Sequence, residues 1–261
     1  MASVMLILAP KEKAVGKETG KKKGKGQLQM QEQEQYMREL KAWLDETADS
    51  NLEEMAEFFQ NRLEGYEEHM SVWRNAYIRM AEYVKPEVKR LLDLGCGTGL
   101  ELDRIWEKYP NLEVTGVDLS EAMLAKLAQK HPDKNQTLIC ADYFQYPFEK
   151  EVYDMVISIE SFHHFKPEKK QKLFQKIYKA LPPGGIFLEA DYFACCEEEE
   201  TLLFTECARR RAAFHIPEEQ FIHFDTPLTP EHEIELLYQA GFGQVELLEC
   251  VSGASFVRGI K

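Results

Sequence analysis

Long hydrophobic runs are missing from this chain of 261 residues. The run VMLILA near the start is too short to span a membrane, and no basic residue precedes it as a secretory signal requires. No other apolar run in the sequence approaches the length of a membrane span. We therefore expect neither a membrane-spanning nor a secreted protein, and we predict a cytoplasmic location.

The six cysteines form no C-x-x-C pair. Cys96 and Cys140 lie in segments that we predict to be buried, so reduced thiols in a cytosol are the simplest explanation. The adjacent pair at 195–196 could bind a metal with His215 or His223, but no ligand spacing supports such a site. We therefore expect no metal site.

Positive charge is scarce except at the start of the chain. The formal net charge is −13, yet residues 1–26 hold seven lysines and two glutamates, so they carry +5 and leave −18 for the rest. An acidic body argues against a general nucleic-acid binder. The run KKKGKG cannot bury apolar surface, so we expect residues 1–35 to form a disordered basic and polar tail.

Segments typical of strands alternate with segments typical of helices from about residue 88 onward. This alternation predicts an α/β fold with a doubly wound, mainly parallel seven-stranded sheet, helices on both faces and an N-terminal helical cover. Residues 36–261 are expected to form a single domain. Its predicted parts are a helical cover at 36–86, a ligand-binding core at 87–191, an insertion at 192–228, and a closing helix and strand pair at 229–261.

The segment LDLGCGTG places Gly95, Gly97 and Gly99 between the first predicted strand and a helix. Such glycines allow positive φ and let a ligand approach the backbone at the positive end of the helix. A phosphate loop would need a lysine and a hydroxyl residue where Leu100 and Glu101 stand, and the dinucleotide pattern G-x-G-x-x-G fails at Leu100. The remaining ligand class is S-adenosylmethionine.

With these residues the sequence resembles the class I S-adenosylmethionine-dependent methyltransferases of the small-molecule type, over roughly residues 50–261. LDLGCGTG is similar to the first motif of the family, D-x-G-x-G-x-G. The segments VTGVDLS, CADY, YDMVISIESFHHF and LPPGGIFLEAD are similar to the family's motifs at strands two to five. The resemblance implies an enzyme that transfers a methyl group from S-adenosylmethionine to a small molecule.

The resemblance also implies which residues bind the cofactor. Asp118 would accept the ribose hydroxyls, while Asp142 would hold the adenine amino group beside the backbone of Tyr143, unless Asp142 is only a helix N-cap. From the cover, Tyr66 would close over the cofactor and Arg62 would reach the methionine carboxylate; simple packing for Tyr66 and solvation for Arg62 are equally open. The full expected set is Asp93, Gly95, Cys96, Gly97, Gly99, Asp118, Leu119, Asp142, Tyr143, Ile159, Tyr66 and Arg62.

Methyl transfer from a sulfonium is an in-line displacement, in which positioning and desolvation can supply most of the rate. His163 and His164 end the fourth predicted strand and are the candidate general bases, needed only if the acceptor loses a proton. The insertion at 192–228 is expected to form the substrate lid, and its mixture of arginines and aromatics favours an amphipathic metabolite. The alternative to a general-base role is that His163 and His164 have no catalytic role.

Three other functions stay open at this point. A tRNA or protein methyltransferase could dock its substrate through the lysine-rich tail. A regulator could bind S-adenosylmethionine without catalysis. A carboxymethyl-type transferase would need an extra cationic residue near the sulfonium, and no motif identifies one.

Overall fold

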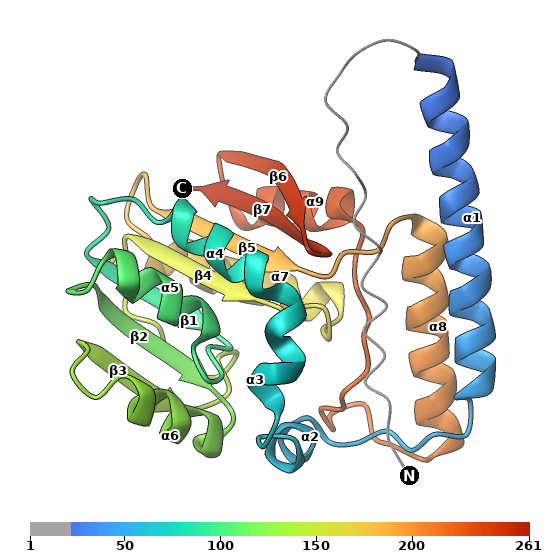
Figure 1. Cartoon of the computed structure of the whole chain (residues 1–261), viewed down its shortest axis with the longest axis horizontal. Helices are drawn as coiled ribbons and strands as arrows, with labels where there is room; N and C mark the ends of the chain where they lie inside the picture. The colour runs from blue at the N-terminus through green and yellow to red at the C-terminus, as the bar shows by residue number, and fades with distance from the viewer. Residues whose placement is uncertain (1–21) are drawn as a thin grey trace.

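The structure is a computed structural model that describes residues 22–261 (Figure 1). Its helices are α1 (Lys22–Glu46), α2 (Met55–Asn61), α3 (Tyr66–His69), α4 (Arg74–Tyr83, after a 3-10 turn at Met70–Trp73), α5 (Leu100–Lys108), α6 (Glu121–Lys130), α7 (Pro167–Ala180), α8 (Glu197–Ala213) and α9 (Pro230–Ala240). Its strands are β1 (Arg90–Leu94), β2 (Glu113–Asp118), β3 (Gln136–Cys140), β4 (Met155–Ile159), β5 (Ile186–Asp191), β6 (Gln244–Val251) and β7 (Ala254–Ile260).

The seven strands form one sheet in the order β3-β2-β1-β4-β5-β7-β6. The first five are parallel, and β7 runs antiparallel to both β5 and β6. The central strands are nearly continuous apolar runs because helices cover them on both faces. The predicted mainly parallel, doubly wound sheet is confirmed. Strand order reverses between β1 and β4, and ligands of open α/β sheets bind at the carboxyl ends of such a pair.

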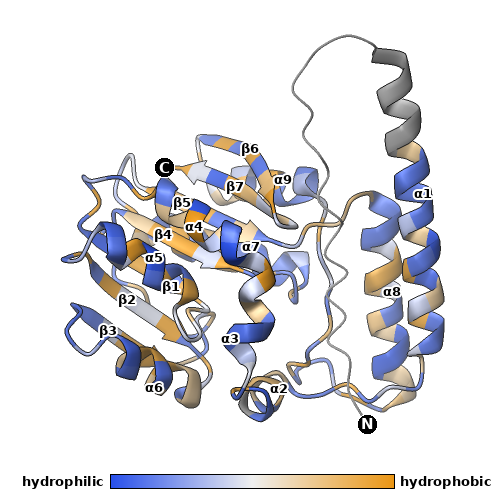
Figure 2. Cartoon of the chain, viewed as in Figure 1, coloured by the Kyte–Doolittle hydropathy of each residue, from blue (hydrophilic) through white to orange (hydrophobic). Residues whose placement is uncertain are grey.

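Helices α4, α5 and α6 cover one face of the sheet, while α7 and α9 cover the other. Alternate strand residues therefore enter different cores: Leu91 of β1 packs with the first group and Leu92 with the second. Figure 2 shows the central strands coloured mainly as hydrophobic and α1 mainly as hydrophilic. The sheet between two helical layers fixes the edge at which the site lies.

Helices α1 and α8 lie side by side at one end of the molecule (Figure 1). Met37, Leu40 and Leu44 of α1 pack with Leu203 of α8 in a third, smaller core. One expectation is corrected here. Residues 22–35 are helical rather than disordered, because their Gln, Glu and Met residues favour a helix that this core anchors. The insertion expected at 192–228 contains the 17-residue helix α8. Residues 1–21 of the predicted tail lie outside the described residues.

All six cysteines are free, in agreement with the expectation of reduced thiols. Cys96 is buried as predicted, but Cys140 is exposed. The reason is that β3 is an edge strand, so its last residue is not covered from both sides. Within residues 22–261, no helix combines the length and apolarity that crossing a bilayer requires.

Candidate active site

The predicted glycine loop lies between β1 and α5, at the carboxyl edge of the sheet. Gly95, Gly97 and Gly99 have positive φ angles of 78°, 48° and 71°, a region that favours glycine. A Cβ atom at Gly95 would lie 2.2 Å from Ser161 Oγ, so the loop packs too closely on the segment after β4 to accept a side chain. The loop therefore presents a bare backbone surface at the switch point of the sheet.

Asp118, the last residue of β2, is joined to this loop. Gly97 N donates a hydrogen bond to Asp118 Oδ2 at 2.9 Å, and Ser120 N donates to Oδ1 at 2.8 Å. Burial raises the pKa of Asp118, while the backbone donors oppose that rise. The structure thus places this carboxylate beside the glycine loop, where the sequence predicts an acceptor for ribose hydroxyls.

Asp93 and Glu101 are two adjacent buried acids beneath the loop. Neither oxygen of Asp93 accepts a hydrogen bond from an N–H or hydroxyl group in the described part of the chain. Its one hydrogen-bonding neighbour among residues 22–261 is the Glu101 carboxyl, with which it can share a proton. Burial raises the pKa of Asp93 well above its usual range, and burial raises that of Glu101 to about 7. A cationic group near the loop would satisfy these acids. The ammonium group of S-adenosylmethionine has the charge that fits.

A cavity of about 480 Å³ opens on the side of the loop toward β3. Its lining includes Leu119, Asp142, Tyr143 and Phe165. Asp142 Oδ1 also accepts a hydrogen bond from Phe144 N at 2.9 Å, which stabilises the turn after β3. Three of the residues predicted to bind the adenosine end of the cofactor thus share one cavity, and its mixture of aromatic and polar side chains suits a purine ring.

The helical cover brings Tyr66 but not Arg62 into a position that supports the prediction. A Cβ atom at Gly97 would lie 3.7 Å from the Tyr66 hydroxyl oxygen, so this hydroxyl faces the loop. Arg62 instead donates to both carboxylate oxygens of Glu53, at 2.6 and 3.0 Å, and to the Phe58 carbonyl. The expected contact of Arg62 with the methionine carboxylate is not supported, because this ion pair already holds the guanidinium.

Cys96 and Ile159 were expected to contact the cofactor and are both buried. The Cys96 thiol faces β2, since a Cβ atom at Gly116 would lie 2.8 Å from Sγ. The Cys96 backbone remains part of the loop, and its carbonyl accepts a hydrogen bond from Gly99 N at 2.7 Å. Ile159 ends β4, the strand beside β1. Any contact of Cys96 with a ligand would therefore involve the backbone.

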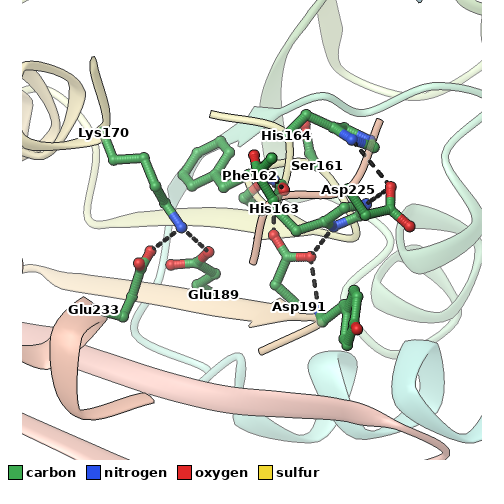
Figure 3. Close-up of polar contacts among 12 residues, drawn as sticks. Ser161, Phe162, His163, His164, Lys170, Glu189, Asp191, Asp225 and Glu233 are labelled. Atoms are coloured by element: carbon green, nitrogen blue, oxygen red, sulfur yellow. Dashed lines mark hydrogen bonds and ion pairs between the residues drawn. The ribbon is translucent and has the colours of Figure 1, made fainter. Parts of the chain in front are cut away.

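His163 is clamped between two carboxylates just beyond β4 (Figure 3). Its Nδ1 forms a short hydrogen bond with Asp191 Oδ1 at the end of β5, and its Nε2 lies 3.5 Å from Asp225 Oδ1. Burial alone would lower the pKa of His163, but Asp191, Asp225 and Glu160 raise it to about 9. His163 is therefore an imidazolium at neutral pH rather than a free base.

His164 lies against His163, with ring centroids 4.0 Å apart. Its Nδ1 lies 3.2 Å from Asp225 Oδ1 and 3.3 Å from the Phe224 carbonyl oxygen. Burial and the charge of His163 lower the pKa of His164, although Asp225 opposes this effect. The two adjacent histidines consequently have opposite shifts, and His164 is the neutral one.

The sequence reasoning missed Glu160, Asp191 and Asp225 as members of this site. Asp191 ends the fifth strand, which was a usable signal because strand ends meet at one edge of a parallel sheet. Asp225 gave no signal, since it lies in the loop after α8. Ligating atoms of His163, His164 and Asp225 lie within 4.8 Å of one another, and so do those of Glu160, His163 and Asp191. Either group is compact enough to hold a cation.

A second buried charge cluster lies beside the first (Figure 3). Lys170 of α7 is 2.5 Å from Glu233 Oε1 of α9 and 3.9 Å from Glu189 Oε1 of β5. All three side chains are almost fully buried. Glu189 is two residues before Asp191 on the same strand, so both carboxylates project from the same face of the sheet. This cluster supports the strand that carries Asp191.

Comparisons with known proteins agree with this geometry. Residues 91–185 match a family model described as a methyltransferase domain. A solved structure of phosphoethanolamine N-methyltransferase 2 from Haemonchus contortus, in complex with phosphomonomethylethanolamine and S-adenosylhomocysteine, is 28% identical with a TM-score of 0.51, covering 67% of this chain and 38% of that one. Residues 91–185 are thus similar to a methyltransferase domain, and the chain as a whole is similar to S-adenosylmethionine-dependent methyltransferases.

Two curated relatives of this chain have different activities in their names. A malonyl-[acyl-carrier protein] O-methyltransferase of Priestia megaterium is 34% identical over 98 residues, which are 38% of this chain and 35% of the relative. A carboxy-S-adenosyl-L-methionine synthase of Nitratiruptor sp. is 29% identical over 192 residues, which are 69% of this chain and 78% of the relative. Three curated relatives are matched over only 35–50% of their own length.

S-adenosylmethionine is the cofactor that the similarity to methyltransferases implies, and the residues present fit it. Gly95, with a φ of 78°, packs on Ser161 too closely for a Cβ atom, so the loop offers bare backbone to a ligand. Asp93 supplies buried carboxylate oxygens that accept no hydrogen bond from residues 22–261, apart from a proton shared with Glu101. Asp118 supplies a carboxylate at the loop, and the cavity near Asp142 has room for a purine.

Proposed function

We propose that this protein transfers the methyl group of S-adenosylmethionine to a small-molecule acceptor. The observation that supports this most directly is the glycine loop with positive φ, hydrogen-bonded through Gly97 to Asp118 at the switch point of the sheet. The expected binding residues divide into three groups around it. Asp93 and the loop suit the methionine end, Asp118 suits the ribose, and Asp142 with Leu119 suits the adenine.

The bound cofactor supplies an electrophilic methyl group on a sulfonium. The residues of this chain then position the acceptor and exclude water from it. Tyr66 of the cover faces the loop from one side. The segment after α8 closes the other side, since Thr226 N donates to the His163 carbonyl at 2.7 Å and His223 stacks on Phe58 of α2 at a centroid distance of 3.6 Å. We infer that residues 192–228 form the acceptor wall.

Substitution of Asp118 by Ala tests the cofactor assignment. We expect affinity for S-adenosylmethionine to fall at least tenfold, because charge-assisted hydrogen bonds contribute ~1.5–3 kcal/mol each. Isothermal titration calorimetry with S-adenosylmethionine, S-adenosylhomocysteine, NAD and ATP measures both affinity and selectivity. Glu113→Ala is the control, since Glu113 is an exposed acid on the same strand. Equal affinities in the two variants, or a preference for NAD or ATP, would contradict the proposal.

We infer that His164, rather than His163, accepts a proton from the acceptor when one is released. His163, Asp225 and His223 surround His164. Because the pKa of His164 is lowered, it is unprotonated at pH 7, and kcat should decline only at a pH below the range in which an ordinary histidine titrates.

His164→Ala should lower kcat by about 100-fold or more and leave affinity for S-adenosylhomocysteine unchanged. The pH profile of tritiated-methyl transfer to an acceptor found by screening provides the measurement. His215→Ala is the control, because His215 lies in the turn after α8. A kcat within threefold of the wild type would remove the base role of His164.

A further inference from the structure

Five side chains at the carboxyl edge of β4 and β5 form what we call the acidic histidine cluster: Glu160, His163, His164, Asp191 and Asp225. Three are carboxylates, and the ligating atoms form two groups that share His163: His163, His164 and Asp225 lie within 4.8 Å of one another, and so do Glu160, His163 and Asp191. Only His163 has a carboxylate beside each ring nitrogen, so the geometry fixes one imidazolium. One positive charge against three carboxylates leaves an excess of negative charge in a largely buried place. Such charge is costly to bury without a cation.

Glu160 is the member of the cluster that can accept a further hydrogen bond. Asp191 is already occupied, because it accepts hydrogen bonds from Phe162 N and Tyr192 N as well as from His163. Glu160 Oε1, in contrast, is buried and has no hydrogen-bond partner in residues 22–261. Because buried oxygens normally accept a hydrogen bond, a ligand with a hydrogen-bond donor would satisfy this one.

The backbone of Glu160 is also held in an unfavourable conformation. Its φ is 49°, in the left-handed region, and its N–H is fixed by a hydrogen bond to the Ala190 carbonyl at 2.9 Å. Such strain costs of order 1–3 kcal/mol and occurs preferentially at functional sites. The next residue, Ser161, packs on Gly95 of the glycine loop. Glu160 is therefore placed directly beside the loop that we assign to the methionine end of the cofactor.

We propose that Glu160 binds the ammonium group of a small amine, which makes this enzyme an N-methyltransferase; the inference rests on the function proposed above. An ammonium supplies both the positive charge that the cluster lacks and an N–H donor for Glu160 Oε1. In the absence of a cation, burial and the charges of Asp191 and Asp225 raise the pKa of Glu160. The phosphoethanolamine enzyme similar to this chain is, by its name, an N-methyltransferase.

The reaction balances without a further reagent. The bound ammonium first loses one proton to Nε2 of His164, which leaves a neutral amine with a lone pair. That nitrogen forms the new N–C bond while the C–S bond breaks and its electron pair stays on sulfur. The products are a methylated ammonium, the thioether S-adenosylhomocysteine and the proton on His164. Glu160 holds the nitrogen before and after transfer because both species are cations.

The test uses the full chain saturated with S-adenosylhomocysteine. Ethanolamine and phosphoethanolamine are titrated by calorimetry against counterparts in which a hydroxyl replaces the amine, ethylene glycol and 2-hydroxyethyl phosphate. We expect at least one amine to bind tenfold or more tightly than its counterpart. Glu160→Gln should remove this preference while the affinity for S-adenosylhomocysteine changes less than twofold. Glu151→Gln is a matched control, because Glu151 also has a left-handed φ, of 57°, but is exposed and precedes β4, at the opposite end of that strand from Glu160.

Each outcome decides the inference. If the wild type binds S-adenosylhomocysteine but shows no preference for either amine, the inference is overturned and the proposed function stands. If Zn²⁺ or Mg²⁺ binds instead and Glu160→Gln abolishes that binding, the cluster is a metal site and the inference is overturned. If the wild type binds no S-adenosylhomocysteine, the proposed function itself fails. Should Glu160→Gln not fold, Asp225→Asn replaces it, since Asp225 is one-third exposed, at 34%.

Discussion

Replacing Lys170 with Met is expected to lower the free energy of unfolding by about 3–5 kcal/mol, because it leaves buried carboxylates without their cation. Lys170 is only 1% exposed and forms ion pairs with Glu189 and Glu233. Burial raises the pKa of both carboxyls, and Lys170 opposes this rise. Without the lysine both should bind protons more readily. The stability loss should therefore be largest above pH 7 and should shrink as the pH falls.

Urea unfolding at pH 8 and pH 5 measures both the loss and its pH dependence. Lys172→Met, on an exposed position of the same helix, is the control and should change stability by less than about 0.5 kcal/mol. Combining Lys170→Met with Glu189→Leu and Glu233→Leu should recover most of the loss, since an apolar replacement of a buried ion cluster is often neutral. If the Lys170→Met variant is as stable as Lys172→Met, the ion pairs of Lys170 do not contribute to the free energy of unfolding.

Replacing Gly95 with Ala is expected to weaken S-adenosylhomocysteine binding by roughly 30-fold or more, which corresponds to about 2 kcal/mol. The new methyl group would meet Ser161 Oγ at 2.2 Å, and the φ of 78° is unfavourable for any residue with a Cβ atom. The loop must therefore move away from the position in which its backbone faces the ligand.

Gly184→Ala separates the two causes of this effect. Gly184 has nearly the same φ, of 81°, but a Cβ atom there meets nothing within 4 Å. We expect Gly184→Ala to lower stability by about 1–2 kcal/mol without affecting ligand binding. Calorimetry and thermal unfolding of both variants provide the comparison. Equal effects on binding would show that close packing of the loop on Ser161 is unimportant.

The sheet and the glycine loop could be predicted because local sequence determines them. Each central strand is a short apolar run, and each flanking helix has its own period of apolar residues. Asp118 could be placed for the same reason, since a residue at the end of a parallel strand has a fixed position at the sheet edge. These features depend on few contacts between distant segments.

The features that the sequence did not reveal depend on long-range pairing. The guanidinium of Arg62 was expected to be available, but Glu53 holds it, and a partner nine residues away is not set by helical spacing. Asp225 joins His163 and His164 only because the segment after α8 folds back across the sheet edge. Helix α1 has little amphipathic character, so its contact with α8 is hard to recognise from sequence.

The pairing of α1 with α8 also has a consequence for synthesis of the chain. Met37 and Leu40 pack with Leu203, more than 160 residues later. At about 5–20 residues per second, α1 must wait roughly 8–32 s on the ribosome before its partner emerges. Its polar surface suits that interval, because a helix with few apolar side chains gives nascent neighbours little surface for aggregation. The apolar contacts of α1 would thus form among the last, after the sheet is complete up to β5.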